Sequence, residues 1–190
     1  MFSDASAVAI GFIGYVRSFN TNNSIHVAFL SANSRVAPKG AHSIPRLELC
    51  AAVEAALAAT SIKNELRQPS MPVFMYTDSM IVLGYLMNST RHFSNYVTRR
   101  VQLILNVTQQ SQWCHVRTDE NPADLASRPQ DTESLINSMW LRGPALLWNR
   151  CDTLPPPSPV DVSNLPEIEH RCNKVIHSAG TDILQEMCSK

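Results

Sequence analysis

Apolar positions along the chain form short continuous runs in the first part and a helical repeat in the middle. Residues 9–16 and 24–30 are apolar runs of strand length, and the polar turn Asn20-Thr21-Asn22-Asn23 between them predicts a β-hairpin. Two strands come first, and strands then alternate with helices, which is the order of an α/β domain. The later elements expected are helices over 46–65, 79–87 and 93–108, strands over 73–77 and 113–117, and a short helix from Pro122.

Four acidic residues hold particular places in this pattern. Asp4 and Asp78 end short apolar segments, Glu48 lies one turn into the alanine-rich helix, and Asp124 opens the last short helix. Two magnesium ions about 4 Å apart need several carboxylate oxygens from different elements, because magnesium prefers oxygen ligands. Taken singly, Asp78 and Asp124 are equally well explained as helix caps. That alternative does not account for Glu48.

Each acid sits in a short motif, and the motifs occur in a fixed order. Together they resemble the ribonuclease H domain of a Bel/Pao-type LTR retrotransposon polyprotein, a region often labelled the Pao retrotransposon peptidase. The resemblance covers residues 1–150. It rests on Phe2-Ser3-Asp4-Ala5-Ser6, Ala32-Asn33-Ser34-Arg35-Val36-Ala37-Pro38, Ser43-Ile44-Pro45-Arg46-Leu47-Glu48-Leu49-Cys50-Ala51-Ala52, Tyr76-Thr77-Asp78-Ser79 and Glu120-Asn121-Pro122-Ala123-Asp124-Leu125-Ala126-Ser127-Arg128.

The resemblance implies an α/β, ribonuclease H-like three-layer fold, with a mixed five-stranded sheet and helices on both faces. It implies that Asp4, Glu48, Asp78 and Asp124 are the catalytic residues and hold two Mg²⁺ ions, with Mn²⁺ as an alternative. The implied reaction is hydrolysis of the RNA strand of an RNA/DNA hybrid, and the ribose 2′-hydroxyl would distinguish RNA from DNA. A reverse transcriptase domain of the same polyprotein is a second expected partner.

The chain departs from the family pattern at its first strand. Only Met1, Phe2 and Ser3 precede Asp4, so we expect a truncated first strand that leaves neighbouring backbone groups unpaired. Such a chain is either a fragment of a longer polyprotein or a degenerate copy. A catalytically inactive nucleic-acid-binding or structural remnant is therefore the alternative function. His115 lies inside a predicted strand, and a structural role is favoured for it.

An aspartic peptidase, as the family label suggests, is a further alternative. That chemistry needs an Asp-Thr-Gly or Asp-Ser-Gly turn, in which glycine permits a tight loop. Neither tripeptide occurs in this chain, and Asp78-Ser79 is followed by Met80. The peptidase is accordingly the least favoured function.

The formal net charge is zero, whereas nucleic-acid-binding domains usually carry a basic face. Binding to a duplex therefore requires that the basic residues gather on one side. A solvated helix face explains Arg99 and Arg100 as well as a substrate contact does. The nucleic-acid-binding candidates are Arg35, Lys39, Arg46, Arg91, Arg99 and Arg100.

The five cysteines are an odd number without close pairs, which favours a reducing compartment. Cys172 with His170 and His177 lacks the paired cysteines of a zinc module, so no zinc site is predicted. No apolar run reaches the roughly 20 residues that span a bilayer, and Asp4 interrupts any signal peptide. We expect an intracellular, cytoplasmic protein that is not secreted, with virus-like particles as a second location.

The sequence changes character after the last motif. We expect a ribonuclease H-like domain over 1–130 and a Trp/Gly-Pro packing segment over 131–150, with Trp140 and Trp148 as packing anchors. Residues 151–190 are expected to form a proline-rich linker and a flexible tail, because residues 155–159 read Pro-Pro-Pro-Ser-Pro and the rest is polar without periodicity.

Overall fold

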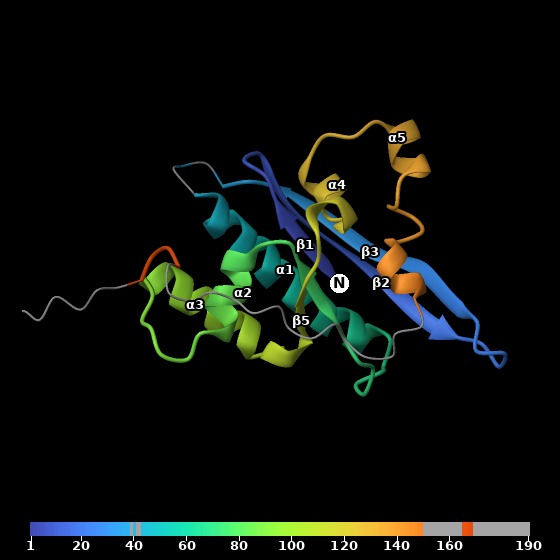
Figure 1. The fold of residues 1–190 in the computed structure, drawn as a ribbon, viewed down its shortest axis with the longest axis horizontal. Helices are drawn as coiled ribbons and strands as arrows, with labels where there is room; N and C mark the ends of the chain where they lie inside the picture. Colours follow the sequence, from blue (N-terminus) through green and yellow to red (C-terminus); the bar gives the residue numbers. More distant parts are fainter. Residues whose placement is uncertain (39, 41–42, 150–164, 169–190) are drawn as a thin grey trace, which may run out of the picture.

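A mixed five-stranded sheet forms the centre of the molecule (Figure 1). The computed structural model describes residues 1–38, 40, 43–149 and 165–168. The strands are β1 (Phe2–Ala5), β2 (Ala9–Phe19), β3 (Ile25–Val36), β4 (Met75–Thr77) and β5 (Trp113–His115), in the spatial order β3-β2-β1-β4-β5. The pairs β1–β2 and β2–β3 are antiparallel, whereas β1–β4 and β4–β5 are parallel. The α/β, ribonuclease H-like fold class is confirmed.

Helices lie on both faces of this sheet, which gives three layers. On one face, α1 packs on β1 and β2 and also contacts α2 and α3. On the other face, α4 contacts β1, β2 and β3, and the segment up to residue 149 follows it. The helices are α1 (Ile44–Glu65), α2 (Met80–Met87), α3 (Asn95–Leu105), α4 (Asp124–Ser127) and α5 (Thr132–Asn137), with 3₁₀ turns η1 (Gln110–Gln112), η2 (Thr118–Glu120) and η3 (Ala145–Trp148). Among the residues the structure describes, no helix is long and apolar enough to cross a bilayer.

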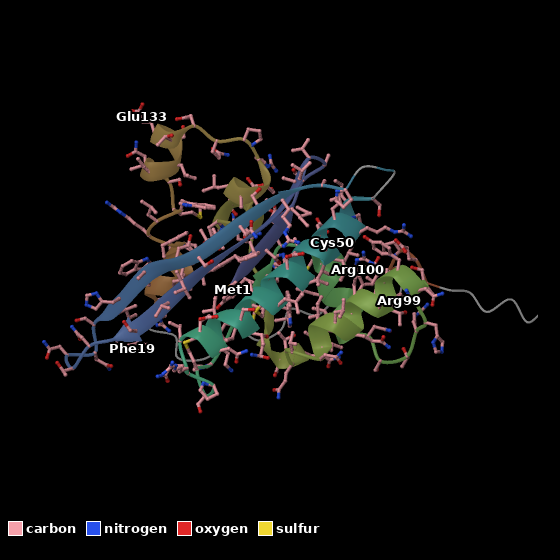
Figure 2. The ribbon with its side chains drawn as sticks, turned by 180° about the vertical axis from the view of Figure 1, so that it is seen from behind. Met1, Phe19, Cys50, Arg99, Arg100 and Glu133 are labelled. Carbon is pink, nitrogen blue, oxygen red and sulfur yellow. The ribbon has the colours of Figure 1, made fainter. Side chains whose placement is uncertain are left out.

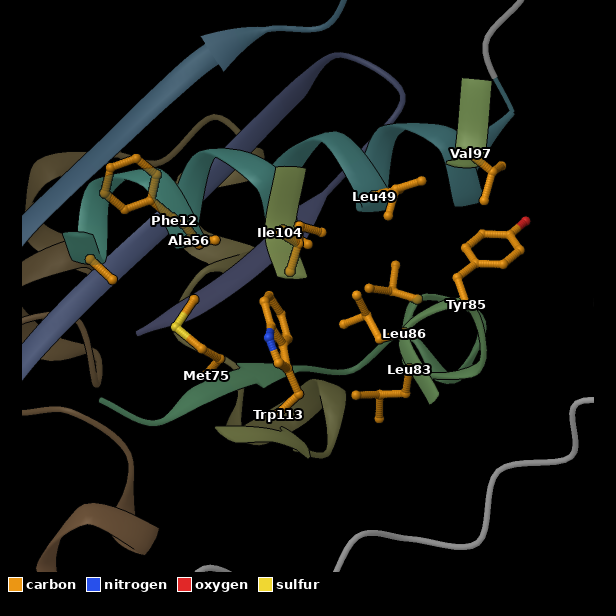
Figure 3. Packing of buried hydrophobic residues seen from close by; sticks show 14 of the residues in the cluster. Phe12, Leu49, Ala56, Met75, Leu83, Tyr85, Leu86, Val97, Ile104 and Trp113 are labelled. Carbon is orange, nitrogen blue, oxygen red and sulfur yellow. The ribbon is translucent and has the colours of Figure 1, made fainter. Parts of the chain in front are cut away.

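The main core lies between the sheet and α1, α2 and α3 (Figure 3). Alanines on one side of α1, from Ala52 to Ala59, are buried and bring this helix close to the strands. Trp113 fills the space beneath and donates a hydrogen bond from Nε1 to Thr108 Oγ1 (3.0 Å). Because apolar side chains cover both faces of the short strands, β4 and β5 appear in the sequence as continuous apolar runs.

Several element boundaries differ from the prediction. The hairpin is longer, because pairing continues from Ala9↔Val36 to Phe19↔Ile25, and a register shift at Gly14/Tyr15 leaves one extra residue, Leu30, as a bulge in β3. The predicted strand 73–77 begins only at Met75, where its pairing with β5 starts (Met75↔Trp113). Helix α3 is shorter at both ends than the predicted 93–108; Phe93 instead forms an isolated bridge with Ile168.

The truncated first strand is confirmed, but the expected loss of pairing is confined to its outer end. Phe2–Ala5 pair with Ile10–Ile13, and Phe2 and Ser3 also pair with β4. Even Met1 joins the ladder, because its nitrogen donates to Phe74 O and its oxygen accepts from Tyr76 N, both at 2.8 Å. Beyond Met1, the residues 15–19 of β2 meet no described strand on the β1 side.

Two later segments pack on this framework. The Tyr15 hydroxyl donates to Trp140 O (2.7 Å), and Leu146 and Leu147 cover Phe2, so residues 139–149 lie on the α4 face of the sheet. The expected linker and tail, residues 151–190, lie outside the described residues apart from Leu165–Ile168.

The segment Leu165–Ile168 joins the helices on the opposite face. Leu165 is buried in the main core against Gly84. Glu167 accepts from Arg46 Nε and Nη2 (2.5 and 2.8 Å) and from the Ser94 hydroxyl (2.5 Å). No periodic pattern in the sequence predicts this contact, which connects the starts of α1 and α3.

Candidate active site

Two of the acids lie side by side at the same edge of the sheet. Strands β1 and β4 run parallel with Phe2↔Tyr76 and Ser3↔Thr77 in register, so the next residues along the strands are Asp4 and Asp78. Carboxyl ends of adjacent parallel strands meet at one edge, where ligand sites of open α/β sheets commonly lie. Asp78 is at the predicted strand-to-helix junction, but it is not the cap of α2: that role belongs to Ser79, whose Oγ accepts from Val82 N (3.2 Å).

Glu48 approaches the same edge from α1. The Ser79 hydroxyl donates to Glu48 Oε2 and so connects the first turn of α1 to the start of α2. Burial raises the pKa of the Glu48 carboxyl; the Ser79 hydrogen bond opposes this shift, and the negative charges of Asp78 and Asp4 add to it.

Asp124 is brought in by the short helix α4. It is the first residue of that helix, preceded by Ala123 as N-cap, so Asp124 is not the cap either. The Arg128 Nε lies 2.8 Å from Asp124 Oδ1, but the pair is not aligned as a hydrogen bond. Asp124 Oδ1 is buried and has no hydrogen-bond partner in the described part of the chain. The cation beside this oxygen is the Arg128 guanidinium, which forms an ion pair with it.

Three serine hydroxyls hold α4 against the sheet. Ser34 Oγ donates to Ala126 O (2.7 Å), and Ser6 Oγ donates to Ser127 O (2.6 Å). The Ser127 hydroxyl in turn donates to Asp4 Oδ2. Gly11 of β2 lies directly beneath this helix, because a Cβ added there would be 2.6 Å from Ala126 Cβ. The position of α4, and with it Asp124, is therefore fixed by β1, β2 and β3 together.

The site is short of positive charge. Burial raises the pKa of Asp4, whose side chain is almost fully covered; the Ser127 hydrogen bond lowers it, and Asp78 and Asp124 raise it further. Of the four acids, Asp124 has an arginine beside it, and that arginine is largely exposed. Clustered carboxylates that raise one another's pKa favour the binding of a divalent cation.

The carboxylates are near one another without converging on one point. Within the described ranges, no three His, Cys, Asp or Glu side chains are placed to hold a common ion. Asp4 and Glu48 instead accept from serines. Carboxylate oxygens are the ligand type that a hard divalent metal prefers, so the donor set is of the right chemistry, although the described arrangement does not bring three of these side chains to one ion.

Sequence reasoning missed the part played by Ser79 and Ser127. Both lie in the quoted motifs, directly after or close after an acid, and their hydroxyls orient Glu48 and Asp4. The feature of the sequence that could have identified these two serines is their position close after a candidate metal-binding acid. His115 is half-buried and pairs with Thr77, but it is the last residue of β5, so it ends the strand and does not lie inside it as expected.

The nucleic-acid candidates do not form one free basic face. Arg35 pairs with Glu54 (2.8 Å), and Arg46 pairs with Glu167. Arg100 stacks on the Tyr96 ring (3.5 Å to the centroid) and donates to Cys50 Sγ. Arg91 and Arg99 are exposed, and Lys39 lies outside the described residues.

Comparison with known proteins identifies the N-terminal part of the chain. Residues 1–79 match the family model described as the Pao retrotransposon-like RNaseH-like domain. This range contains Asp4, Glu48 and Asp78, whereas Asp124 lies beyond it. No curated protein and no solved structure matches the chain. Over residues 1–79 this chain is therefore similar to the Pao retrotransposon-like RNaseH-like domain, the family that its motifs resemble.

Proposed function

We propose that this chain is a metal-dependent ribonuclease H-type endonuclease that hydrolyses the RNA strand of RNA/DNA hybrids. The observation that carries the proposal is the adjacency of Asp4 and Asp78 at the ends of parallel strands, with Glu48 bound to Ser79 beside Asp78, and Asp4 bound to Ser127 of the helix that begins with Asp124. Asp4 is buried and the other three acids are half-buried, whereas acids with no such role usually lie fully exposed on the surface.

Asp4, Glu48, Asp78 and Asp124 would hold two Mg²⁺ ions, or Mn²⁺ in their place. Such ions, when bound, lower the pKa of an attacking water and stabilise the leaving oxygen of a phosphodiester. The protein's own contribution is to orient the ligands: Ser127 and Ser79 hold the carboxylates of Asp4 and Glu48 in place from opposite sides of the sheet edge. Burial of Asp4 keeps bulk water from the floor of the site.

The substrate class follows from the family resemblance. Contacts to the ribose 2′-hydroxyl across the minor groove would select the RNA strand. The exposed Arg91 and Arg99 can bind phosphates directly. Arg35 and Arg46 would first have to leave Glu54 and Glu167. A reverse transcriptase domain that adds basic surface would strengthen the binding of a hybrid to this chain, whose own net charge is zero.

The test is cleavage of a labelled RNA/DNA hybrid by the purified chain with magnesium. We expect the RNA strand to be cut, the cutting to be abolished in Asp78→Asn and by chelation, and an RNA duplex to remain intact. Arg91→Ala serves as a matched surface control, with a smaller loss that shrinks at low salt. Cutting that persists in Asp78→Asn would refute the proposed site.

One observation favours a second function, the inactive remnant. The described acids do not converge on a single ion position, and two of them are engaged by serines. A calorimetric titration with Mn²⁺ separates the two functions. Binding that is lost in Asp4→Asn supports the nuclease, whereas a folded chain that binds neither Mn²⁺ nor Mg²⁺ at millimolar concentration supports the remnant.

A further inference from the structure

The segment Leu165–Ile168, orange-red beside the start of α3 in Figure 1, brings a carboxylate to the first turn of α1. One oxygen of Glu167 accepts from Arg46 Nε (2.5 Å), and the other accepts from Arg46 Nη2 (2.8 Å) and from the Ser94 hydroxyl (2.5 Å). A planar guanidinium that binds both oxygens of a carboxylate presents the same two donors to two oxygens of a phosphate. Glu167 therefore occupies a site whose donors also fit a phosphate group.

The arginine of this site is held by a second contact that does not involve Glu167. The Arg46 guanidinium lies over the Tyr96 ring, 4.4 Å from its centroid, and the Arg100 guanidinium lies 3.5 Å from the same centroid. Figure 2 shows Arg100 of α3 beside Cys50 of α1, whose Sγ accepts from Arg100 Nε (3.3 Å). Contact with the ring orients Arg46 even when its carboxylate leaves, so the donors of the site are largely pre-organised.

Arg100 adds uncompensated positive charge next to this site. Among the residues that the structure describes, no carboxylate forms an ion pair with Arg100, whereas Glu167 neutralises Arg46. Two guanidinium groups on one aromatic ring repel each other unless anions lie nearby. The cluster of Arg46, Tyr96 and Arg100 therefore favours an anion at the place where the Glu167 carboxylate lies.

The backbone of Glu167 is strained in this position. Its φ is 61°, in the left-handed region that glycine adopts readily and glutamate rarely. Such a conformation persists only where the surroundings hold it, and here the carboxylate contacts and the hydrogen bond from Ser94 N to Glu167 O (3.0 Å) do so. Departure of the carboxylate from Arg46 releases this strain, which favours opening of the site.

Opening requires only a local change. Leu165 is buried in the main core, and Pro166 O accepts from the Tyr85 hydroxyl (3.3 Å). A rotation about φ of Glu167 turns its side chain away from Arg46 while both of these residues stay in place. It breaks the bridge between Phe93 and Ile168 together with the ion pair, and leaves the core packing unchanged.

The site lies at the same end of α1 as the candidate catalytic residues. Arg46 precedes Glu48 by two residues in the first turns of this helix, and Glu48 accepts from Ser79 at the start of α2. A nucleic-acid strand that reaches Glu48 therefore passes close to Arg46. Backbone phosphates are the anions that such a strand brings to this position.

We propose that Arg46 and Ser94 form a binding site for a backbone phosphate of a nucleic-acid strand, and that Glu167 closes this site as an internal competitor. The phosphate and the Glu167 carboxylate bind in turn, because both need the same donors. This inference rests on the proposed function for the identity of the ligand, but it concerns binding and not cleavage. If Glu167 closes the site in about nine molecules out of ten, the apparent affinity for the strand is lowered about tenfold.

The test measures binding of a labelled RNA/DNA hybrid to the whole chain by fluorescence anisotropy, with EDTA present to prevent metal-dependent cleavage. Glu167→Gln should bind the hybrid about tenfold more tightly than the unaltered chain, because the competing charge is gone. The slope of log K against log salt should steepen by about one, since one more phosphate is neutralised. The gain should vanish when Arg46→Gln is combined with Glu167→Gln, because the two residues act through one site.

Two further variants serve as controls. Glu133→Gln makes the same change of net charge at an exposed residue of α5, far from Arg100 in Figure 2, and should stay within about twofold of the unaltered affinity because salt screens distant charges. Glu167→Gly also removes the carboxylate and accommodates the positive φ without strain, so it should show the same gain as Glu167→Gln. Circular dichroism checks that each variant is folded; if Glu167→Gln is not, Glu167→Gly supplies the comparison.

Four results would overturn the inference: an unchanged affinity in both Glu167 variants, a gain that persists without Arg46, an equal gain in Glu133→Gln, or no binding of the hybrid by any of these chains. Cleavage with magnesium decides the proposed function separately. A chain that gains affinity through Glu167→Gln but cuts no hybrid retains the phosphate site and is not a nuclease. A chain that cuts the hybrid without this gain is a nuclease that lacks the internal competitor.

Discussion

Replacement of Gly11 by alanine tests whether β2 positions the last acid of the site. An added Cβ would be 2.6 Å from Ala126 Cβ and 3.1 Å from the Ala126 backbone carbon, and neither atom belongs to a side chain that can swing away. Ordinary contact begins at about 3.5 Å, so α4 must move outward by nearly 1 Å. Overpacking of this kind costs about 1–3 kcal/mol.

The displacement acts on function through two residues of α4. Asp124 would move with the helix, and the Ser127 hydroxyl would move away from Asp4. A displacement of about 1 Å in a positioned catalytic group costs about 100-fold in rate. We therefore expect Gly11→Ala to cleave the hybrid about 100-fold more slowly and to melt about 5 °C lower.

The matched control is Gly14→Ala on the same strand. There the added Cβ would meet Met1 Sδ at 2.4 Å, which is the end of a flexible side chain that can turn aside. We expect its rate to stay within about threefold of the unaltered chain. Thermal unfolding by circular dichroism and Mn²⁺ titration accompany the cleavage assay, so stability and ligand geometry are measured separately. If Gly11→Ala and Gly14→Ala behave alike in all three, the argument that β2 positions α4 is wrong.

Three further predictions follow from the contacts of the site and the core. Without metal, Asp4→Asn should be more stable than the unaltered chain near neutral pH but not near pH 4. Folding raises the pKa of Asp4, so the native state binds its proton more tightly than the unfolded chain does. The stability of the unaltered chain therefore falls as the pH rises above about 4, whereas Asp4→Asn does not lose this stability. Urea unfolding of both chains at several pH values measures this, and a difference independent of pH would contradict it. Ser79→Ala should destabilise the fold by about 1 kcal/mol through loss of the α2 cap, and should raise the pKa of Glu48 further by removing its hydrogen bond. Denaturant unfolding and carboxyl NMR titration check the two effects, with the exposed Ser89→Ala as a surface control. Leu165→Ala should cost about 2 kcal/mol because this side chain is buried in the main core; an unchanged melting temperature would show that Leu165 does not pack on α2.

The sequence predicted those parts of the fold that depend on local pattern. The hairpin, the long helix of Glu48 and the strand before Asp78 each have a periodicity of their own, and all three form. The predicted boundaries failed where the outcome depends on a distant partner. Phe93 lies outside α3 because it pairs with Ile168, far along the chain. Residues 73 and 74 lie outside β4, which begins at Met75.

The candidate site shows the same division. The order of the motifs identified the four acids as candidates. The hydrogen bonds from Ser127 to Asp4 and from Ser79 to Glu48 depend on contacts between elements that no local pattern encodes. The basic residues were predicted as a group from charge alone. Their carboxylate partners, Glu54 and Glu167, come from other elements and could not be foreseen from spacing.

The bulge at Leu30 has a consequence for how this chain behaves at high concentration. β3 is a 12-residue strand at the border of the sheet, largely open to solvent, and a long flat border strand readily joins a copy of itself into aggregates. The extra residue bends the strand and increases its twist, so that two copies cannot match their amides along the full length. Removal of this one residue would straighten the border and favour fibrous self-association, even though every buried side chain of the core stayed in place.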